Sequence, residues 1–317
     1  TAIGIAALAA DDPTARQESV SRFGTVRLSP ATLQRLTTAE ALDDIWGLSP
    51  LQHGVYYQCT LGDAPTTTYI AQNVFTVDRR VDIAAMQAAF TALLARHPQL
   101  RAGFRGVEHA EPHPAADASA VVQVVLTAPP SSITVLDLSD RPADEAATAL
   151  QAVVEDDRTT PFDLAAPPLL RLTVVRLPEG RDRMLLTYHF LLFDGWSREL
   201  VLRELFALYA SGGRQGAIVP RPGVVTDYLR WIERTGEADA LAAWTDLLAG
   251  LDGPTSASGH RPHEAPVDTE PGRIVVAVDE PTTARLGDTA AALGVTLNAV
   301  VTTCLLYTSD AADEGLG

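Results

Sequence analysis

The residues that could do chemistry most directly are a histidine and an aspartate near the end of the most apolar segment of the chain. His189 lies within the segment MLLTYHFLLF, and Asp194 and Gly195 follow this segment at once. A histidine can accept or donate a proton near neutral pH, because its ordinary pKa is about 6.5. A carboxylate that follows a buried strand needs a partner, since buried charges are paired. The pattern fits acid–base chemistry, although Asp-Gly is also a common turn pair that could simply end a strand.

Alternating strand and helix patterns flank this segment and would position it. Residues 184–193 are nearly all apolar, which predicts a strand buried on both faces. Residues 197–209 predict an amphipathic helix after it. Further strands are predicted at 119–127, 169–177 and 273–278, and further helices at 30–36, 81–95, 143–156, 225–234, 239–249 and 281–293. Because strands and helices interleave, we expect an α/β or α+β fold.

The charge of the chain is strongly negative. Its 317 residues include 40 acidic residues against 24 basic ones, all of them arginine, which gives a formal net charge of −16. An acidic chain without a basic run argues against nucleic acid or an anionic membrane as a partner. No apolar run reaches the length of a membrane span, so we expect neither partner.

The cysteines do not predict a metal site. Cys59 and Cys304 are the two cysteines of the chain, and neither has metal-ligand spacing around it. We therefore expect no bound metal and no disulfide framework, and a reducing, cytoplasmic location. The opening residues TAIGIAALAADD lack a basic leader and a cleavage site, so they do not predict a signal peptide.

Five segments of the chain carry a family pattern when they are taken in order. They are DIWGLSPLQHGVYYQ at 44–58, RHPQLRAGF at 96–104, TPFDLAAPPLLRLTVVRL at 160–177, HFLLFDGWS at 189–197, and TDYLRWI with AAWTDLL at 226–232 and 242–248. Each segment alone has a simpler interpretation as a helix end, a turn or a strand. Their order and spacing together resemble the condensation domain of nonribosomal peptide synthetases over about residues 30–303.

The resemblance implies two lobes in a V shape, each similar to chloramphenicol acetyltransferase. We expect an interdomain linker at 1–40, an N-terminal lobe at 41–211 and a partial C-terminal lobe at 212–303. A loop rich in Gly, Pro and Arg at 211–223 marks the expected boundary between the lobes. The second lobe would be truncated at its C-terminal end. The segment LSPATLQRLTTAEALDDIW also resembles the linker that follows an upstream carrier protein domain.

The family implies formation of an amide bond between two tethered substrates. A donor aminoacyl or peptidyl thioester and an acceptor aminoacyl amine would meet in a tunnel between the lobes, each held on the phosphopantetheine of a carrier domain. Holding both substrates together supplies much of the rate through proximity. The implied partners are the upstream and downstream carrier domains and an adenylation domain of the same assembly line. No cofactor would bind the chain directly.

The family motif HHxxxDG aligns with residues 189–195, and one residue departs from it. His189, Asp194 and Gly195 match the motif, whereas Phe190 stands at the position of the second histidine. In the family this histidine is viewed as a general base or as the group that positions the amine. A phenyl ring can do neither. Because neighbouring strand residues point to opposite faces, we expect His189 to face the interior in a structural role, while Gly195 would let the backbone turn.

The residues around the motif are expected to support it. In the family, the aspartate of the motif forms an ion pair with an arginine. We therefore expect Asp194 to be buried and paired with Arg96, or otherwise with Arg101. Trp196 and Ser197 would begin the next helix, with Ser197 as its N-cap.

Other functions remain open on this pattern. A non-catalytic domain that recruits partner enzymes to a carrier-bound peptide is favoured by Phe190. A free-standing acyltransferase with soluble acyl donors shares HxxxD-type motifs, but the carrier-style linker argues against it. An epimerisation domain is a further alternative, although the SPLQHG opening and the DGWS context look more like condensation.

The last residues of the chain, 304–317, fit no predicted element. Their segment CLLYTSDAADE resembles the translation of a transposase-based sequencing adapter read in one frame. We therefore interpret residues 304–317 as adapter-derived, with the native coding sequence reaching about Thr303. An ordinary polar tail is the alternative interpretation.

Overall fold

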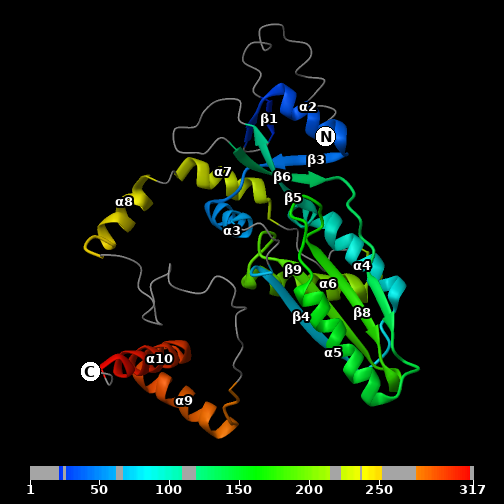
Figure 1. Cartoon of the computed structure of the whole chain (residues 1–317), viewed down its shortest axis with the longest axis vertical. Helices are drawn as coiled ribbons and strands as arrows, with labels where there is room; N and C mark the ends of the chain where they lie inside the picture. The colour runs from blue at the N-terminus through cyan, green and yellow to red at the C-terminus, as the bar shows by residue number, and fades with distance from the viewer. Residues whose placement is uncertain are drawn as a thin grey trace. The chain divides into compact units, whose positions relative to one another are not determined.

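The computed structural model describes residues 21–23, 26–61, 67–108, 119–214, 223–235, 238–251 and 276–314. The chain divides into two compact units between residues 236 and 237. All of the described strands lie in the first unit (Figure 1).

Four strands form the larger sheet of the first unit. Its order is β4–β9–β8–β7, from β4 (Ile70–Val77), β9 (Asp182–His189), β8 (Leu170–Arg176) and β7 (Thr134–Asp137). Strand β9 pairs antiparallel with both β4 and β8, and β7 runs parallel to β8. Strand β9 therefore has a hydrogen-bonded neighbour on each side.

Helices cover both faces of this sheet (Figure 1). On one face lie α4 (Ile83–Arg96) and α6 (Gly195–Ala210), and on the other lies α5 (Ala143–Thr159). Side chains of β9 alternate between the two faces, so that Tyr188 packs with α4 and α6 whereas Leu185 packs with α5. By the same alternation, Thr187 and His189 belong to the face that α5 covers.

Two smaller sheets complete the strands that the structure describes. The order β3–β6–β5 is antiparallel throughout, and β1 pairs with β2. Their bounds are β1 (Ser21–Phe23), β2 (Val26–Leu28), β3 (Leu42–Trp46), β5 (Ala102–Glu108) and β6 (Ser119–Leu126). Helix α2 (Pro30–Ala39) packs on a second apolar core through Leu33 and Leu36. Short 3₁₀ helices lie at Pro98–Arg101 and Pro178–Gly180.

Helix α3 (Pro50–Thr60) begins with a capping box that also fixes the turn after β9. The side chain of Ser49 accepts from the Gln52 backbone N–H at 3.3 Å, and Gln52 Oε1 accepts from the Ser49 N–H at 3.0 Å. Gln52 Nε2 then donates to the Leu191 carbonyl at 2.9 Å and to Gln123 Oε1 at 3.2 Å. The start of α3 is therefore bound both to β6 and to the turn that follows β9.

Helix α7 (Val225–Thr235) belongs to the first unit. Leu229 packs there against Trp46, Ala102 and Val125. The expected lobe boundary at 211–223 precedes α7, whereas the division between the compact units follows it. The assignment of residues 41–211 and 212–303 to two lobes stays a prediction.

The described part of the second unit is helical. It contains α8 (Ala238–Leu247), α9 (Glu280–Leu293) and α10 (Leu297–Glu314). Helix α9 begins where the Asp279 side chain accepts from the Thr282 N–H at 2.8 Å, and it ends at Gly294, whose φ of 65° is left-handed. Helix α10 contradicts our expectation that residues 304–317 fit no element, because 304–314 are helical. Leucine, alanine and glutamate in this stretch favour helix.

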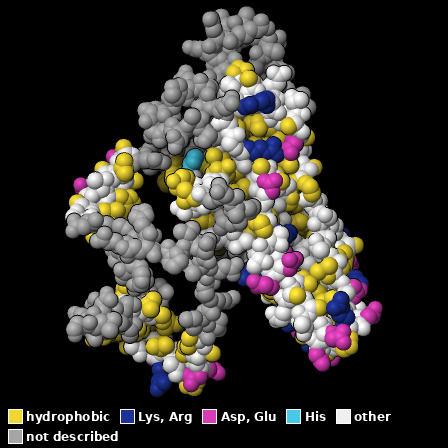
Figure 2. Space-filling view, viewed as in Figure 1, with side chains coloured by type: hydrophobic (Ala, Val, Ile, Leu, Met, Phe, Trp, Pro, Cys, Tyr) yellow, Lys and Arg dark blue, Asp and Glu magenta, His cyan; other side chains and the backbone are white. Residues whose placement is uncertain are grey.

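Hydrophobic side chains lie exposed on these helices, and Figure 2 shows such side chains along the left side of the view. Among them are Leu241, Trp244, Leu247, Leu293, Leu305, Leu306 and Tyr307. No single described helix is long and apolar enough to cross a membrane, while α9 and the first part of α10, bent by 98°, pass that test only as a pair.

The expected mixed fold is confirmed, and two details near the motif need correction. Strand β9 ends at His189 instead of continuing to residue 193, because residues 190–192 form a turn. The N-cap of α6 is Asp194 and not Ser197. The expected strand at 273–278 lies partly outside the described residues, and its described part, 276–278, is not in a strand.

Candidate functional site

The motif residues lie where β9 turns into α6. The His189 N–H donates to the Leu169 carbonyl at 3.0 Å, which extends the pairing with the chain before β8. The Phe190 N–H donates to the Tyr69 carbonyl at 3.0 Å, next to β4. Main-chain bonds to both neighbours therefore fix the backbone at the point where the strand ends.

His189 is buried, with 1% of its surface exposed, and its surroundings determine its protonation. Burial lowers its pKa to about 4, so the imidazole is neutral at pH 7. The Leu191 N–H lies 3.1 Å from Nδ1 and can only donate, so Nδ1 is the acceptor. The hydrogen-bond network therefore assigns the proton to Nε2, which faces Cys59 Sγ at 3.6 Å. The expectation that His189 faces the interior is confirmed.

Phe190 is the first residue of the turn after β9 and is 40% exposed. Its ring makes an edge-to-face contact with Tyr188, with centroids 5.9 Å apart. Tyr188 in turn stacks on Phe193, with centroids 4.3 Å apart. The position that corresponds to the second histidine of the family motif is thus part of a small aromatic cluster on the α4 and α6 side of β9.

Asp194 is exposed, and our expectation that it is buried in an ion pair is wrong. Its carboxylate accepts from the Ser197 N–H at 2.8 Å and caps α6. This hydrogen bond holds the pKa of Asp194 below its usual value. An aspartate that directly precedes a helix can satisfy its charge at the helix N-terminus and needs no arginine. Trp196, in the first turn of α6, is 87% exposed.

The two arginines that we expected at Asp194 have other acidic partners. Arg96 Nε donates to Glu204 Oε2 at 2.8 Å, and His97 Nε2 lies 2.6 Å from the same oxygen. All three side chains are at least nine-tenths buried. Their contacts bind the end of α4 to the middle of α6.

Arg101 instead supports β3 and the end of β6. Its NH2 donates to Asp43 Oδ2 at 2.7 Å, and its Nε donates to the Leu94 carbonyl at 3.0 Å. Its NH1 contacts the carbonyls of Leu126 and Thr127. Arg101 therefore connects the end of α4 to the β3–β6–β5 sheet.

A pocket of about 530 Å³ lies beside His189 on the α5 side of β9. Its walls come from α3, from β5 and from the segment between α5 and β8. They consist of Tyr56, Cys59, Thr60, Phe104, Pro161, Phe162, Asp163, Leu164, Ala165 and His189. Sequence reasoning placed only His189 among these as a site residue. Burial raises the pKa values of Tyr56 and Cys59, so both groups are neutral at pH 7.

Among the described residues, no three His, Cys, Asp or Glu side chains come together in a way that could hold a metal ion. Cys59 and Cys304 are both thiols and are not joined in a disulfide.

The layered sheet with helices on both faces is the chloramphenicol acetyltransferase-like fold of condensation domains. The structure is similar to the first condensation domain of the calcium-dependent antibiotic synthetase, with a TM-score of 0.62 and 22% identity over 81% of this chain and 58% of that one. It is also similar to the starter condensation domain of rhizomide synthetase, with a TM-score of 0.56 and 19% identity over 67% of this chain and 50% of that one.

The family is shown by sequence. A profile of the condensation domain matches residues 43–308, and the chain therefore belongs to the condensation-domain family. A linear gramicidin synthase of Brevibacillus parabrevis is 34% identical over 217 residues, which is 68% of this chain and 4% of that protein. Bacitracin synthase 3 of Bacillus licheniformis is 23% identical over 293 residues, or 92% of this chain and 4% of that protein. The chain thus spans about 4% of the length of these relatives.

Proposed function

We propose that the chain serves as the condensation domain of a nonribosomal peptide synthetase. In this role it joins a carrier-bound aminoacyl or peptidyl donor to a carrier-bound aminoacyl acceptor through an amide bond. The observation that carries the proposal is the family match over residues 43–308. The relatives in Brevibacillus and Bacillus are named as synthases of peptide antibiotics, which supports a peptide product.

The proposed partners are the other domains of such an assembly line. An upstream and a downstream carrier domain would present the donor and the acceptor on phosphopantetheine arms, and an adenylation domain would supply the activated amino acids. Residues 41–211 and 212–303 would belong to the two lobes between which the arms meet. The thiol state of Cys59 and Cys304 is consistent with a cytoplasmic location.

The reaction needs a place for one proton. The acceptor amine attacks the thioester carbonyl, a C–N bond forms, the C–S bond breaks, and the amine gives up a proton as the thiol leaves. Phe190 has no lone pair to take this proton. His189 has none to offer either, because Nδ1 accepts from Leu191 and Nε2 carries the ring proton.

Neither position of the motif's histidine pair therefore supplies a base. Orientation of two tethered substrates alone can leave residual activity. A positioned base usually contributes about 10² to 10⁴ in rate. We accordingly expect condensation by this chain to be slow compared with a relative that keeps both histidines.

The second candidate function is recruitment of a partner enzyme without catalysis. It is favoured by the exposed ring of Phe190, which replaces a polar group with an apolar contact surface. Both functions require binding of carrier domains, so binding alone does not separate them.

The test uses the full-length synthetase with both carriers loaded. Mass spectrometry of the acceptor carrier should show the condensed product forming slowly, and only when the donor is tethered to its carrier. Equal rates with a free acyl-CoA donor would instead indicate a soluble acyltransferase. Carrier binding with no product over many hours would indicate recruitment.

A further inference from the structure

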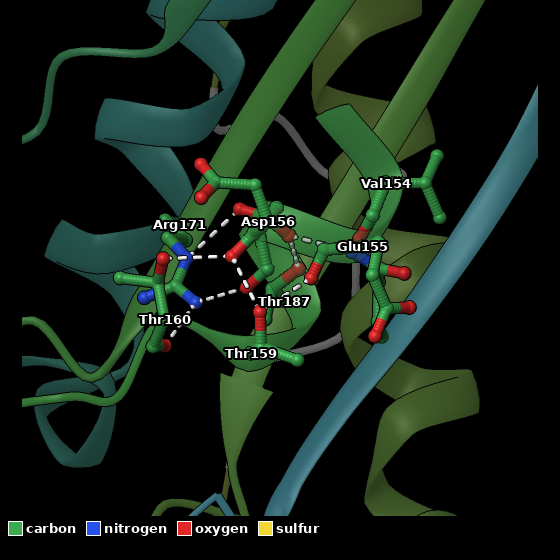
Figure 3. Close-up of polar contacts among 9 residues, drawn as sticks. Val154, Glu155, Asp156, Thr159, Thr160, Arg171 and Thr187 are labelled. Carbon is green, nitrogen blue, oxygen red and sulfur yellow. Dashed lines mark hydrogen bonds and ion pairs between the residues drawn. The ribbon is translucent and has the colours of Figure 1, made fainter. Parts of the chain in front are cut away.

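A buried polar network joins the end of α5 to three strands of the larger sheet. The Asp157 carboxylate accepts from Arg171 Nε at 2.9 Å, from Gln72 Nε2 at 2.7 Å and from the Thr187 hydroxyl. Gln72 lies on β4, Arg171 on β8 and Thr187 on β9. Figure 3 shows Arg171 and Thr187 facing this end of the helix. Asp157 therefore gathers one donor from each strand, and its side chain is only 11% exposed.

Arg171 extends this network into the segment that follows α5. Its NH2 donates to the carbonyls of Asp157 and Thr160, the latter at 2.6 Å. Its guanidinium carbon lies 4.2 Å from the ring centroid of Phe162. Only a planar guanidinium can serve a carboxylate, two carbonyls and an aromatic face at once. The position of Phe162 thus depends on the orientation that Asp157 gives to Arg171.

Phe162 is the point where this network reaches the pocket. Its ring meets the His189 ring edge to face, with centroids 6.4 Å apart, and both rings line the pocket. The Arg171 guanidinium lies over the face of the same phenyl ring. Phe162 is therefore held by contacts with a fixed cation and with a buried imidazole.

The far end of the segment between α5 and β8 is attached to β5, in the β3–β6–β5 sheet. The Leu164 carbonyl accepts from the Phe104 N–H at 2.7 Å, and the Ala165 carbonyl accepts from Arg105 Nε and NH2 at 3.2 and 3.1 Å. Gly103 allows this approach, since a Cβ there would lie 2.9 Å from the Ala165 carbonyl oxygen and 2.7 Å from Pro167 Cδ. The pocket wall at 161–165 is thus anchored at both ends, and Arg171 holds the end nearer His189.

We propose that Asp157 and Arg171 form a positioning pair that fixes Phe162 and so sets the shape of the pocket beside His189. The pocket is lined mainly by aromatic and aliphatic side chains, with a neutral imidazole, which suits an apolar side chain of a tethered substrate. This substrate assignment rests on the proposed function, whereas the positioning role does not. Asp163, the acidic residue of the wall, uses Oδ1 to accept from the Ala165 N–H at 2.9 Å.

The pocket contains its own reporter, the thiol of Cys59. In the 317-residue chain with Cys304→Ser, Cys59 is the remaining thiol. Labelling by N-ethylmaleimide, followed by mass spectrometry, then measures access to the pocket. Arg171→Met keeps the aliphatic stem and removes the guanidinium, and it should raise the labelling rate about tenfold by freeing the wall. Arg171→Lys, which keeps the charge without the planar fork, should fall between the parent and Arg171→Met.

Two controls separate positioning from general loss of stability. Arg183→Met removes an arginine of β9 that contacts Thr76 and does not line the pocket, and it should leave labelling within about twofold of the parent. Leu150→Ala destabilises the core between α5 and the sheet without touching the pocket. The labelling rates of Leu150→Ala and Arg171→Met are compared under conditions in which the two variants have the same free energy of unfolding.

If Asp157 and Arg171 position Phe162, labelling of Cys59 should be faster in Arg171→Met than in Leu150→Ala. Equal labelling in these two variants, or labelling of Arg171→Met at the parent rate, overturns it. In the condensation assay, Arg171→Met should also shift the ratio of rates for donors with small and large apolar side chains, whereas Arg183→Met should not. Absence of product in every variant, including the parent, counts against the proposed function and leaves the labelling result to decide the positioning role.

Discussion

At the scale of single residues, His189 and Phe190 stand at the two positions of the family's histidine pair, and their surroundings differ. His189 keeps the first position and is buried, neutral and bonded at both ring nitrogens. Phe190 takes the second position and is partly exposed against Tyr188. The first residue therefore holds the turn together, and the second offers an apolar surface where the family offers an imidazole.

Stability should depend on pH through His189. Its pKa is about 4 in the folded chain and about 6.5 in the unfolded chain, so the unfolded state binds the extra proton between these values. Folding stability is fully present above about pH 6.5 and should fall as the pH drops toward 4, by up to about 3 kcal/mol. Urea unfolding at pH 7.5 and at pH 5 measures this loss.

The matched variant for this prediction is His189→Asn. An asparagine carbonyl can accept from the Leu191 N–H as Nδ1 does, but it does not titrate. The difference in stability between pH 7.5 and pH 5 should be smaller in His189→Asn than in the parent. The same difference in both proteins would show that other groups cause the pH dependence.

At the scale of elements, the sequence predicts the regular parts of the fold better than the contacts between them. The apolar run before Asp194 correctly predicts a strand buried on both faces, and the helical stripe at 81–95 corresponds to α4. The partners of Arg96 could not be predicted in this way. Glu204 looks like an ordinary surface residue on the pattern of α6, and only tertiary packing buries it against α4.

The pocket shows the same limit of sequence reasoning. Cys59 lies far in sequence from the segment that contains Phe162 and Arg171, and nothing in the spacing indicates that these residues gather near His189. Long-range contacts between α3, β8 and the segment after α5 bring them together. The motif spacing likewise could not show that β9 ends at His189, because residues 190–192 are as apolar as the strand itself.

Two carboxylates near the motif should differ sharply in their contribution to stability. Glu204→Ala removes the buried carboxylate that Arg96 and His97 both contact. It should lower the free energy of unfolding by about 3–5 kcal/mol. Asp194→Ala removes an exposed helix cap and should cost about 1 kcal/mol. Chemical denaturation of both variants measures the contrast. Equal losses would mean that Asp194 carries a buried ion pair after all.

At the scale of the whole molecule, the surface of the described second unit carries many apolar side chains. Leu247 is 71% exposed and Tyr307 is 74% exposed. The chain also covers only 58% of the length of a solved condensation domain that it resembles. An exposed apolar surface of this kind favours association with other chains.

The isolated chain should therefore associate in solution and bind a hydrophobic dye. Size-exclusion chromatography with light scattering and ANS fluorescence measure these properties. The double variant Leu241→Glu/Leu247→Glu, which adds charge to exposed positions of α8, should reduce both signals. A monomeric parent that does not bind ANS would contradict the expectation.

The central claim is that Phe190 occupies the place of the amine-handling histidine, so that the chain binds tethered substrates but handles the proton poorly. Phe190→His would restore the motif at a position that is already partly exposed, so its effect on folding should be small. His189→Asn provides the matched comparison at the neighbouring position, because it changes the buried residue that holds the turn. Carrier binding is measured for every variant, so that loss of binding is not mistaken for loss of chemistry.

The most direct measurement is the rate of condensed product formation on the acceptor carrier, followed by mass spectrometry in the full-length synthetase for the parent and for Phe190→His. The account predicts slow formation by the parent and an increase of at least about tenfold in Phe190→His, the low side of what a positioned base contributes. Fast formation by the parent that Phe190→His leaves unchanged would contradict it, because the histidine would then be dispensable or another residue would occupy its place.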